Sequence, residues 1–336
     1  MIKSKIVSFC NGLSEAGAFT GFLAPAVPVF MIHRVHDLSE CYGGISVDYL
    51  RRCLTYIKQH GYRVLTLDEL YEFIVQGGAI PRKVAVFTID DGFIDHYKNA
   101  ARVFDEYGYP LNFFLVTDLI NKRLWPWDDQ IAWAVKHSSA SRVDVVLPDG
   151  SGFSADIISS TPSRVVERLR EALKCKPEKN LYSWIEGPLC KALGVSLPST
   201  LPEQYEPMSW ANARDLVARG HGVYAHTVSH RILSQLDSNE IEAEVAGSID
   251  EMKSQNIERQ DYFVYPTGRI GDFNEQAKQV LCSQGIKLAF STEPDYAKRS
   301  SDTLSIPRFS LPSNFVDFMQ YLTKFEQFKS ALRAKF

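Results

Sequence analysis

The chain has 336 residues, enough for one large domain or two ordinary ones at about 150 residues per domain. Hydrophobic residues make up 45% of it and charged residues 23%, so a disordered, collagen-like or low-complexity chain is excluded. The 37 basic and 40 acidic side chains leave a formal net charge of -3. This balance argues against a nucleic acid as the main partner, because phosphate neutralisation needs a basic excess.

The cysteines and the N-terminal segment bear on the compartment. The 6 cysteines are scattered and form no CxxC pair, so we expect free thiols in a reducing compartment. A charge-free stretch over 16–32 is similar to a signal peptide, but Glu15 and two prolines argue against one, and the stretch is shorter than the roughly 20 residues of a spanning helix. We therefore predict a cytoplasmic protein without a transmembrane segment. Loose contact with a membrane surface through Phe19 and Phe22 is the alternative.

Strand-like apolar runs alternate with runs of helical period along most of the chain. Strands are predicted at 29–32, 62–65, 84–89, 111–116, 222–225, 262–265, 288–291 and 304–308, and helices at 48–60, 67–76, 97–107, 209–219, 238–255 and 274–284. This alternation is typical of an α/β fold with parallel strands. Seven or eight such strands predict a closed or nearly closed β/α barrel with its active site at the carboxyl ends of the strands.

The alternation pauses between about 121 and 205. This segment contains four of the five tryptophans, a polar turn and a charged helix over 163–173. It is too long for one loop, so we predict an insertion of helices and a hairpin packed on a single domain that spans residues 1–336. Its aromatic side chains would either stack on a sugar ring or form a core, and no separate chemistry is visible in it.

Asp90-Asp91-Gly92 follows directly on the most apolar strand of the chain. A buried strand that ends in adjacent carboxylates must place at least one of them near a cation or water. The pair alone is uninformative, since Asp128-Asp129 is another such pair, and a helix N-cap with a turn glycine is the structural alternative.

His226 and His230 also follow a predicted strand. At i and i+4 on a helical turn, two imidazoles share a face and lie close enough to bind one metal ion. The residues between them lack the glutamate of the HExxH pattern, so a zincin protease is not indicated. Two histidines and one carboxylate are the three protein ligands of an open catalytic metal site, and the second carboxylate is then free to take a proton from water.

Other strand ends offer further candidates. The segment from Phe263 to Gly268 is a predicted strand followed by a Pro-X-Gly turn, which can point a backbone N–H at a developing oxyanion. His33 ends the first predicted strand and Arg308 the last one. Each of these two residues either faces the same pocket as the other candidates or lies on the rim of that pocket.

Taken together, these motifs resemble the polysaccharide deacetylases of carbohydrate esterase family 4, the NodB homology domain. Three motifs carry the resemblance: 88–92 reads TIDDG where the family has TFDDG, 226–230 fits H[ST]xxH, and 265–268 is similar to the third motif. Softer matches at 32–35, 60–65, 208–210 and 306–308 cover most of the chain outside the insertion. They are similar to the branch found in bacterial surface-polysaccharide assembly.

The resemblance implies a distorted β/α barrel of about seven strands and a metal-dependent N-deacetylase acting on N-acetylated amino sugars. Asp91, His226 and His230 would hold Zn²⁺ or a similar divalent ion. Asp90 would be the general base, and the N–H of Thr267 would stabilise the oxyanion. The partner is accordingly a carbohydrate, whose sugar, linkage and length the sequence leaves open, as it does the oligomeric state.

Two departures from the family pattern affect the proton transfers. The family's late motif supplies a histidine as general acid, but no histidine follows His230. His33 is our candidate for that role, and return of the proton by Asp90 is the alternative. The arginine that often precedes the proline of the third motif is also missing, and Arg308 could replace it from the neighbouring strand.

Two other functions remain compatible with the sequence. The site reads only an amide carbonyl, so it also fits hydrolysis of another C–N bond, such as a formamide or a cyclic imide. The missing late histidine is compatible with a catalytically silent glycan-binding module. The three functions differ in their products: a deacetylase releases acetate, the other amidohydrolase releases formate, and a silent module binds glycan without turnover.

Overall fold

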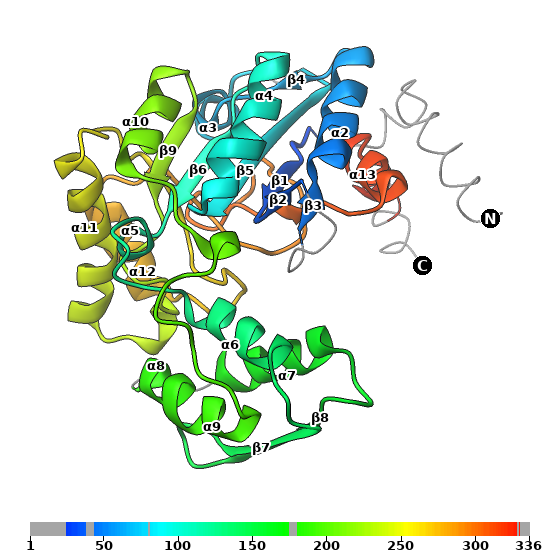
Figure 1. Cartoon of the computed structure of the whole chain (residues 1–336). Helices are drawn as coiled ribbons and strands as arrows, with labels where there is room; N and C mark the ends of the chain where they lie inside the picture. The colour runs from blue at the N-terminus through cyan, green and yellow to red at the C-terminus, as the bar shows by residue number, and fades with distance from the viewer. Residues whose placement is uncertain (1–24, 38–43, 80, 175–179, 328, 330–336) are drawn as a thin grey trace.

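A mostly parallel sheet lies at the centre of the molecule in the computed structural model (Figure 1), which describes residues 25–37, 44–79, 81–174, 180–327 and 329. The strand order is β12-β1-β5-β6-β9, and β4 pairs with β5. These strands are β1 (Val29–Ile32), β4 (Arg63–Val64), β5 (Val84–Asp91), β6 (Asn112–Leu115), β9 (Gly222–Ala225) and β12 (Phe309–Ser310). The predicted α/β fold with parallel strands is therefore confirmed.

The central strand β5 is buried along almost its whole length. Its apolar and β-branched residues suit a strand that is covered on both faces. It runs two residues beyond the predicted strand and includes Asp90 and Asp91. The carboxylates therefore belong to the sheet itself, and their backbone is fixed by pairing with β6 through Phe114 and Leu115.

Helices pack around this sheet. They are α2 (Val47–Gln59), α3 (Leu67–Val75), η2 (His96–Ala101), α4 (Arg102–Tyr107), α5 (Thr117–Ile120), α10 (Trp210–Ala218), α11 (Ser238–Ser254), α12 (Glu275–Ser283) and α13 (Phe315–Leu322). The short strands β2 (Val35–His36) and β3 (Ile45–Ser46) lie beside α2, and the short helix η5 (Leu233–Gln235) precedes α11. Side-chain caps define several starts: Ser46 caps α2, and Asp237 forms a capping box with Glu240 on α11. The predicted helix over 97–107 begins as the π-helix η2 and continues as α4.

The predicted closed barrel is wrong for the described residues. Strands β10 (Tyr262–Val264) and β11 (Leu288–Phe290) form a separate two-stranded sheet, and no backbone ladder joins β10 to β9. The Gln260 side chain spans this gap instead: its Oε1 accepts from the Ala225 N–H at 2.8 Å, and its Nε2 donates to the Val223 carbonyl at 3.4 Å. A side chain thus takes the place of strand pairing there.

The predicted strand over 304–308 is displaced toward the C-terminus. Ile306 makes only an isolated bridge with Phe290, and regular pairing begins at Phe309, which is in register with Phe30 of β1. The chain changes its partner from β11 to β1 at Arg308, so neither ladder is long enough to form the expected strand. This crossing places the Arg308 side chain inside the molecule, where it is 0% exposed.

An insertion lobe, residues 127–193, projects from the core in Figure 1. It contains α6 (Trp127–Lys136), the antiparallel pair β7 (Arg142–Val146) and β8 (Gly152–Asp156), α7 (Pro162–Lys174), α8 (Leu181–Trp184), η3 (Ile185–Leu189) and α9 (Cys190–Leu193). The lobe has its own apolar cluster, which includes Trp127 and Trp184. Short η4 (Glu203–Tyr205) then leads back to the core. These tryptophans therefore serve as core residues.

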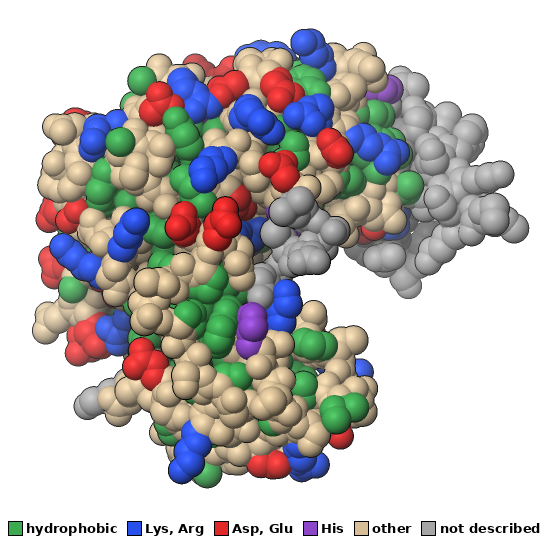
Figure 2. Space-filling model, viewed as in Figure 1, with side chains coloured by type: hydrophobic (Ala, Val, Ile, Leu, Met, Phe, Trp, Pro, Cys, Tyr) green, Lys and Arg blue, Asp and Glu red, His purple; other side chains and the backbone are tan. Residues whose placement is uncertain are grey.

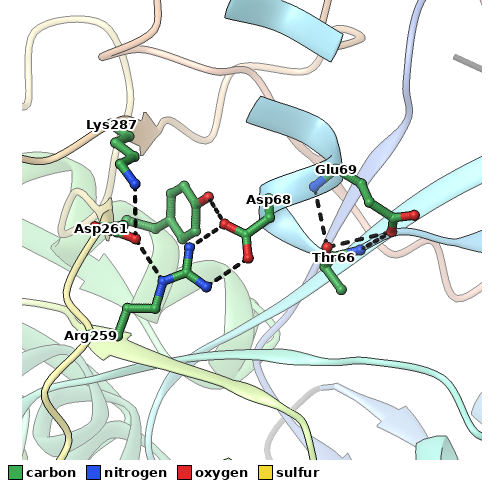
Figure 3. A network of polar contacts seen from close by, with 7 residues as sticks. Thr66, Asp68, Glu69, Arg259, Asp261 and Lys287 are labelled. Carbon is green, nitrogen blue, oxygen red and sulfur yellow. Dashed lines mark hydrogen bonds and ion pairs between the residues drawn. The ribbon is translucent and has the colours of Figure 1, made fainter. Parts of the chain in front are cut away.

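A polar network joins helix α3 to the segments that enter β10 and β11 (Figure 3). Arg259 donates to both carboxylate oxygens of Asp68, and the Tyr262 hydroxyl donates to the same carboxylate at 2.5 Å. Arg259 Nε also donates to Asp261 at 2.6 Å, and Lys287 donates to Asp261 at 3.3 Å. Arg259 and Asp68 are each about half exposed, so the pair contributes modestly to stability.

None of the described helices is long and apolar enough to cross a bilayer. Cys53, Cys190 and Cys282 are unpaired. The N-terminal stretch, with Phe19 and Phe22, lies outside the described residues up to residue 24.

Replacing Gln260 with alanine would leave the buried Ala225 N–H without its partner. We expect the free energy of unfolding to fall by about 1–3 kcal/mol, measured by urea denaturation. Gln76→Ala, at an exposed helix end, is the matched control. Equal stability of both variants would show that the Gln260 bridge is dispensable.

Candidate active site

Asp91, His226 and His230 converge at the carboxyl ends of β5 and β9. The Nε2 atoms of both histidines lie 3.6 Å from Asp91 Oδ1, and one ligand atom from each residue lies within 4.8 Å of the others. The three predicted ligands, which are 135 or more residues apart between the two motifs, therefore meet in space.

The donor set fits a divalent cation. Two ligand atoms about 2.0–2.1 Å from a tetrahedral metal stand about 3.3 Å apart, close to the observed 3.6 Å. His226 Nδ1 lies 2.7 Å from the Val264 carbonyl, which can only accept, so the proton is on Nδ1 and the Nε2 lone pair is free for a metal. This hydrogen bond fixes the tautomer required of a ligand.

The electrostatics also favour a bound cation. Burial, together with Asp128 and Asp90, raises the pKa of Asp91 well above its usual range. Burial and His230 lower the pKa of His226 to about 3, so His226 is the neutral imidazole that coordinates metal. A divalent cation would supply the charge that holds Asp91 ionised.

The predicted helical turn between the two histidines is wrong. Residues 226–230 form an irregular loop in which Thr227 and His230 have positive φ values of 65° and 57°. The Thr227 hydroxyl accepts from the His230 N–H at 3.0 Å, and the two imidazole centroids are 5.0 Å apart. A strained loop, and not helical spacing, therefore brings the two rings together.

Glu244 of α11 holds this loop from behind, and sequence reasoning missed it. Its buried carboxylate accepts from the N–H groups of Val228 and Ser229 at 3.0 and 2.9 Å and from the Ser229 hydroxyl. No local signal distinguishes it from the other glutamates of the helix. Its contacts offset the strain of the left-handed residues beside it.

The end of β5 is strained as well. Asp91 has a φ of 90° and Gly92 a φ of 104°. This backbone conformation favours glycine at position 92, and a Cβ there would also lie 2.7 Å from Ile120 Cδ1, which would have to shift. This bend turns the Asp91 carboxylate toward the two histidines.

Asp90 lies beside the three ligands and is paired with Arg308. Arg308 Nη1 donates to Asp90 Oδ1 at 3.0 Å, and Nη2 lies 2.8 Å from Oδ2. Arg308 is itself held by the Ser291 carbonyl and the Thr88 hydroxyl. Burial alone would raise the pKa of Asp90, but Arg308 and His226 lower it below its usual value. Asp90 is thus an ionised, oriented carboxylate.

His33 directly follows β1 and interacts electrostatically with the site. Its side chain is open to solvent, yet desolvation lowers its pKa, while Asp90 raises it and Arg308 lowers it further. Buried His96, whose pKa burial lowers to about 4, donates from Nε2 to the His33 carbonyl at 2.6 Å and fixes this backbone.

Thr267 occupies the turn after β10, again at positive φ (56°). Its hydroxyl donates to Asp272, which also accepts from the Arg269 N–H, and its carbonyl accepts from the Thr292 hydroxyl at 2.8 Å. Within the described part of the chain, the Thr267 N–H has no hydrogen-bond partner. It is therefore available to a ligand.

Two carboxylates of the insertion lobe also belong to the site's electrostatic surroundings, contrary to the expectation that the insertion has no chemistry. Asp128 acts on the pKa values of Asp91 and His33, and burial with Asp128 raises the pKa of Asp129 well above its usual range. The adjacent Asp128-Asp129 pair was the only sequence signal.

Comparison with known proteins supports the motif-based resemblance. Residues 182–289 match the family model of polysaccharide deacetylase. The matched segment covers less than half of the chain. It includes both histidines and Thr267, whereas Asp90 and Asp91 lie outside it. The resemblance to polysaccharide deacetylases is thereby confirmed. No curated protein sequence matches the chain.

Solved structures share the fold. The Streptococcus pyogenes deacetylase PplD, solved in complex with acetate, is 17% identical with a TM-score of 0.60, and the alignment covers 90% of this chain and 99% of that one. IcaB from Ammonifex degensii is 18% identical with a TM-score of 0.57, covering 89% and 97%. The BpsB deacetylase domain from Bordetella bronchiseptica is 11% identical with a TM-score of 0.52, covering 86% and 98%.

Replacing Glu244 with alanine removes the acceptor behind the histidine loop. We expect zinc affinity to fall about 10- to 100-fold, as for other residues that orient metal ligands, measured by competition with a chromogenic chelator. Glu242→Ala, exposed on the same helix, is the control. Equal zinc affinity in the two variants would exclude a positioning role for Glu244.

Proposed function

We propose that this protein is a metal-dependent hydrolase that removes acetyl groups from N-acetylated amino sugars of an oligosaccharide, polysaccharide or lipid-linked glycan. The observation that supports this most is the convergence of Asp91, His226 and His230 beside a fourth group, Asp90, which is paired with Arg308 and lies outside the ligand set. The match to the polysaccharide deacetylase family gives the reaction class.

Asp91, His226 and His230 would hold the divalent ion, and their two-nitrogen, one-oxygen set suits Zn²⁺. When bound, the ion acts as a Lewis acid that polarises the acetamide carbonyl and lowers the pKa of water. His226 keeps its orientation through its bond to the Val264 carbonyl.

Asp90 would act as the general base and take the proton from the attacking water. Arg308 keeps this carboxylate ionised and oriented, replacing the arginine that the third motif lacks. The free N–H of Thr267 would donate to the carbonyl oxygen as negative charge develops there. A backbone donor tolerates threonine at this position.

The departing amine needs a proton, and we assign the general acid to His33. It directly follows β1, and its carbonyl is held by His96. Return of the proton by Asp90 is the alternative.

The carbohydrate substrate follows from the family match and from the structures that share the fold. The chain would act as one catalytic domain with the insertion beside its mouth, in surface-polysaccharide assembly in the cytoplasm. Its three described cysteines are unpaired, as expected in a reducing compartment. Acetate, present in the PplD structure, is the product that this reaction would release.

The decisive test is acetate release from a panel of N-acetylhexosamine oligosaccharides and lipid-linked sugars. We expect release with zinc, loss with a chelator and recovery on re-addition. Asp90→Asn should lower kcat by about 10²- to 10⁴-fold and leave zinc binding intact, whereas Asp250→Asn, exposed on α11, should match wild type. Release of formate would favour another amidohydrolase, and glycan binding without turnover a silent module.

Replacing His33 with alanine tests the acid. We expect kcat to fall about 10²-fold or more with unchanged zinc affinity, because His33 is outside the ligand set. His137→Ala, an exposed histidine of the insertion lobe, is the control. A rate close to that of wild type would remove His33 and leave Asp90 as the proton donor.

A further inference from the structure

The insertion lobe is anchored next to the first motif. Trp125, just before α6, packs on Tyr205 at 5.0 Å between ring centroids, and Tyr205 packs on Phe93 at 6.5 Å. The Met208 N–H donates to the Gly92 carbonyl at 2.9 Å. Both ends of the insertion are thus fixed within a few residues of Asp91.

Helix α6 lies on the side of the lobe nearest the core in Figure 1, and Figure 2 shows a deep notch between lobe and core. Asp128 is in the first turn of α6, three residues after Trp125, so their Cα atoms are at most about 10 Å apart. The start of this helix is therefore held over the site.

Electrostatic interactions show which groups of the site lie near the Asp128 carboxylate. The charge of Asp128 raises the pKa of both Asp91 and His33. Conversely, burial would raise the pKa of Asp128 itself, but Arg170 and His230 lower it overall. Asp91, His33 and His230 lie at or after the ends of three different strands, and these mutual interactions place the Asp128 carboxylate near all three.

Asp128 is oriented from one side only. Arg170 of α7 donates from Nη2 to the Asp128 carbonyl at 2.9 Å, and the same nitrogen lies 3.5 Å from Oδ2. The Asp128 side chain remains 30% exposed. Besides Arg170, the described donor to this carboxylate is its own backbone N–H. An ionised carboxylate can only accept, so its exposed side is available to a donor on the substrate.

We propose that Asp128 determines specificity by accepting a hydrogen bond from a hydroxyl of the sugar whose acetamide group occupies the site. The inference rests on the proposed function for the identity of the ligand. Asp128 is outside the three-ligand set, so its carboxylate is not needed to hold the metal. The insertion lobe thereby contributes a recognition group to a site whose chemistry comes from the core.

The test compares a sugar with a ligand that has the same reacting group and no hydroxyl. A tetramer of N-acetylglucosamine and acetamide are titrated by ligand-observed NMR into zinc-loaded protein carrying Asp90→Asn, which prevents turnover. Asp128→Asn, nearly equal in shape, is compared with Asp144→Asn, an exposed carboxylate of the same lobe. Asp128→Ser is a second variant if the amide disturbs the fold.

We expect Asp128→Asn to raise the Kd of the tetramer about 10- to 100-fold, the effect of one hydrogen bond to a charged group, and to leave the Kd of acetamide within about twofold. The proposal would be overturned if the Kd of the tetramer were unchanged or if the Kd of both ligands rose equally. It would also be overturned if the tetramer did not bind before Asp128 was substituted. Tetramer binding without acetate release from the wild-type protein would refute the deacetylase function alone, since the variant comparison remains valid.

Discussion

The structure depends on one buried group of polar side chains, in which an ionised Asp91 carboxylate is unfavourable unless a positive charge lies beside it. Asp91 is enclosed with two imidazoles and a second carboxylate, and this burial raises its pKa well above the usual range. Isolated charges in such a place are strongly unfavourable. A divalent ion would offset this cost at Asp91, and Arg308 offsets it at Asp90. The two carboxylates therefore lie in different electrostatic surroundings, which the proposed roles of ligand and base require.

The backbone around this group is strained at residues near the carboxyl ends of the core strands. Asp91, Thr227, His230 and Thr267 all have positive φ, and each follows a strand of the core. β-Branched residues are particularly unfavourable in this conformation, so the surrounding structure must hold them. Glu244 does so for the histidine loop and Asp272 for the Thr267 turn. Strained residues of this kind cluster at functional sites.

Local sequence patterns predicted the parts of the site that depend on local structure. The apolar run before Asp90 predicted a buried strand. The strand ends left Arg308 open between the site and its rim, and only the missing arginine of the third motif suggested that it approaches Asp90. The i,i+4 spacing of His226 and His230 predicted that the two imidazoles lie close together, and they do. It also predicted a helical turn between them, whereas the structure has a loop. Glu244 had no local signal and Asp128 only an uninformative one, the Asp128-Asp129 pair, since their positions depend on packing between distant segments. The barrel prediction placed most of the core strands but could not foresee the gap at Gln260.

Diffraction from crystals grown with zinc, recorded at the zinc absorption edge, would locate the metal. We expect one anomalous peak about 2.0–2.2 Å from Asp91 Oδ1, His226 Nε2 and His230 Nε2, with Asp90 still paired to Arg308 and unliganded. A peak held by other residues, or none at this site at saturating zinc, would contradict this expectation.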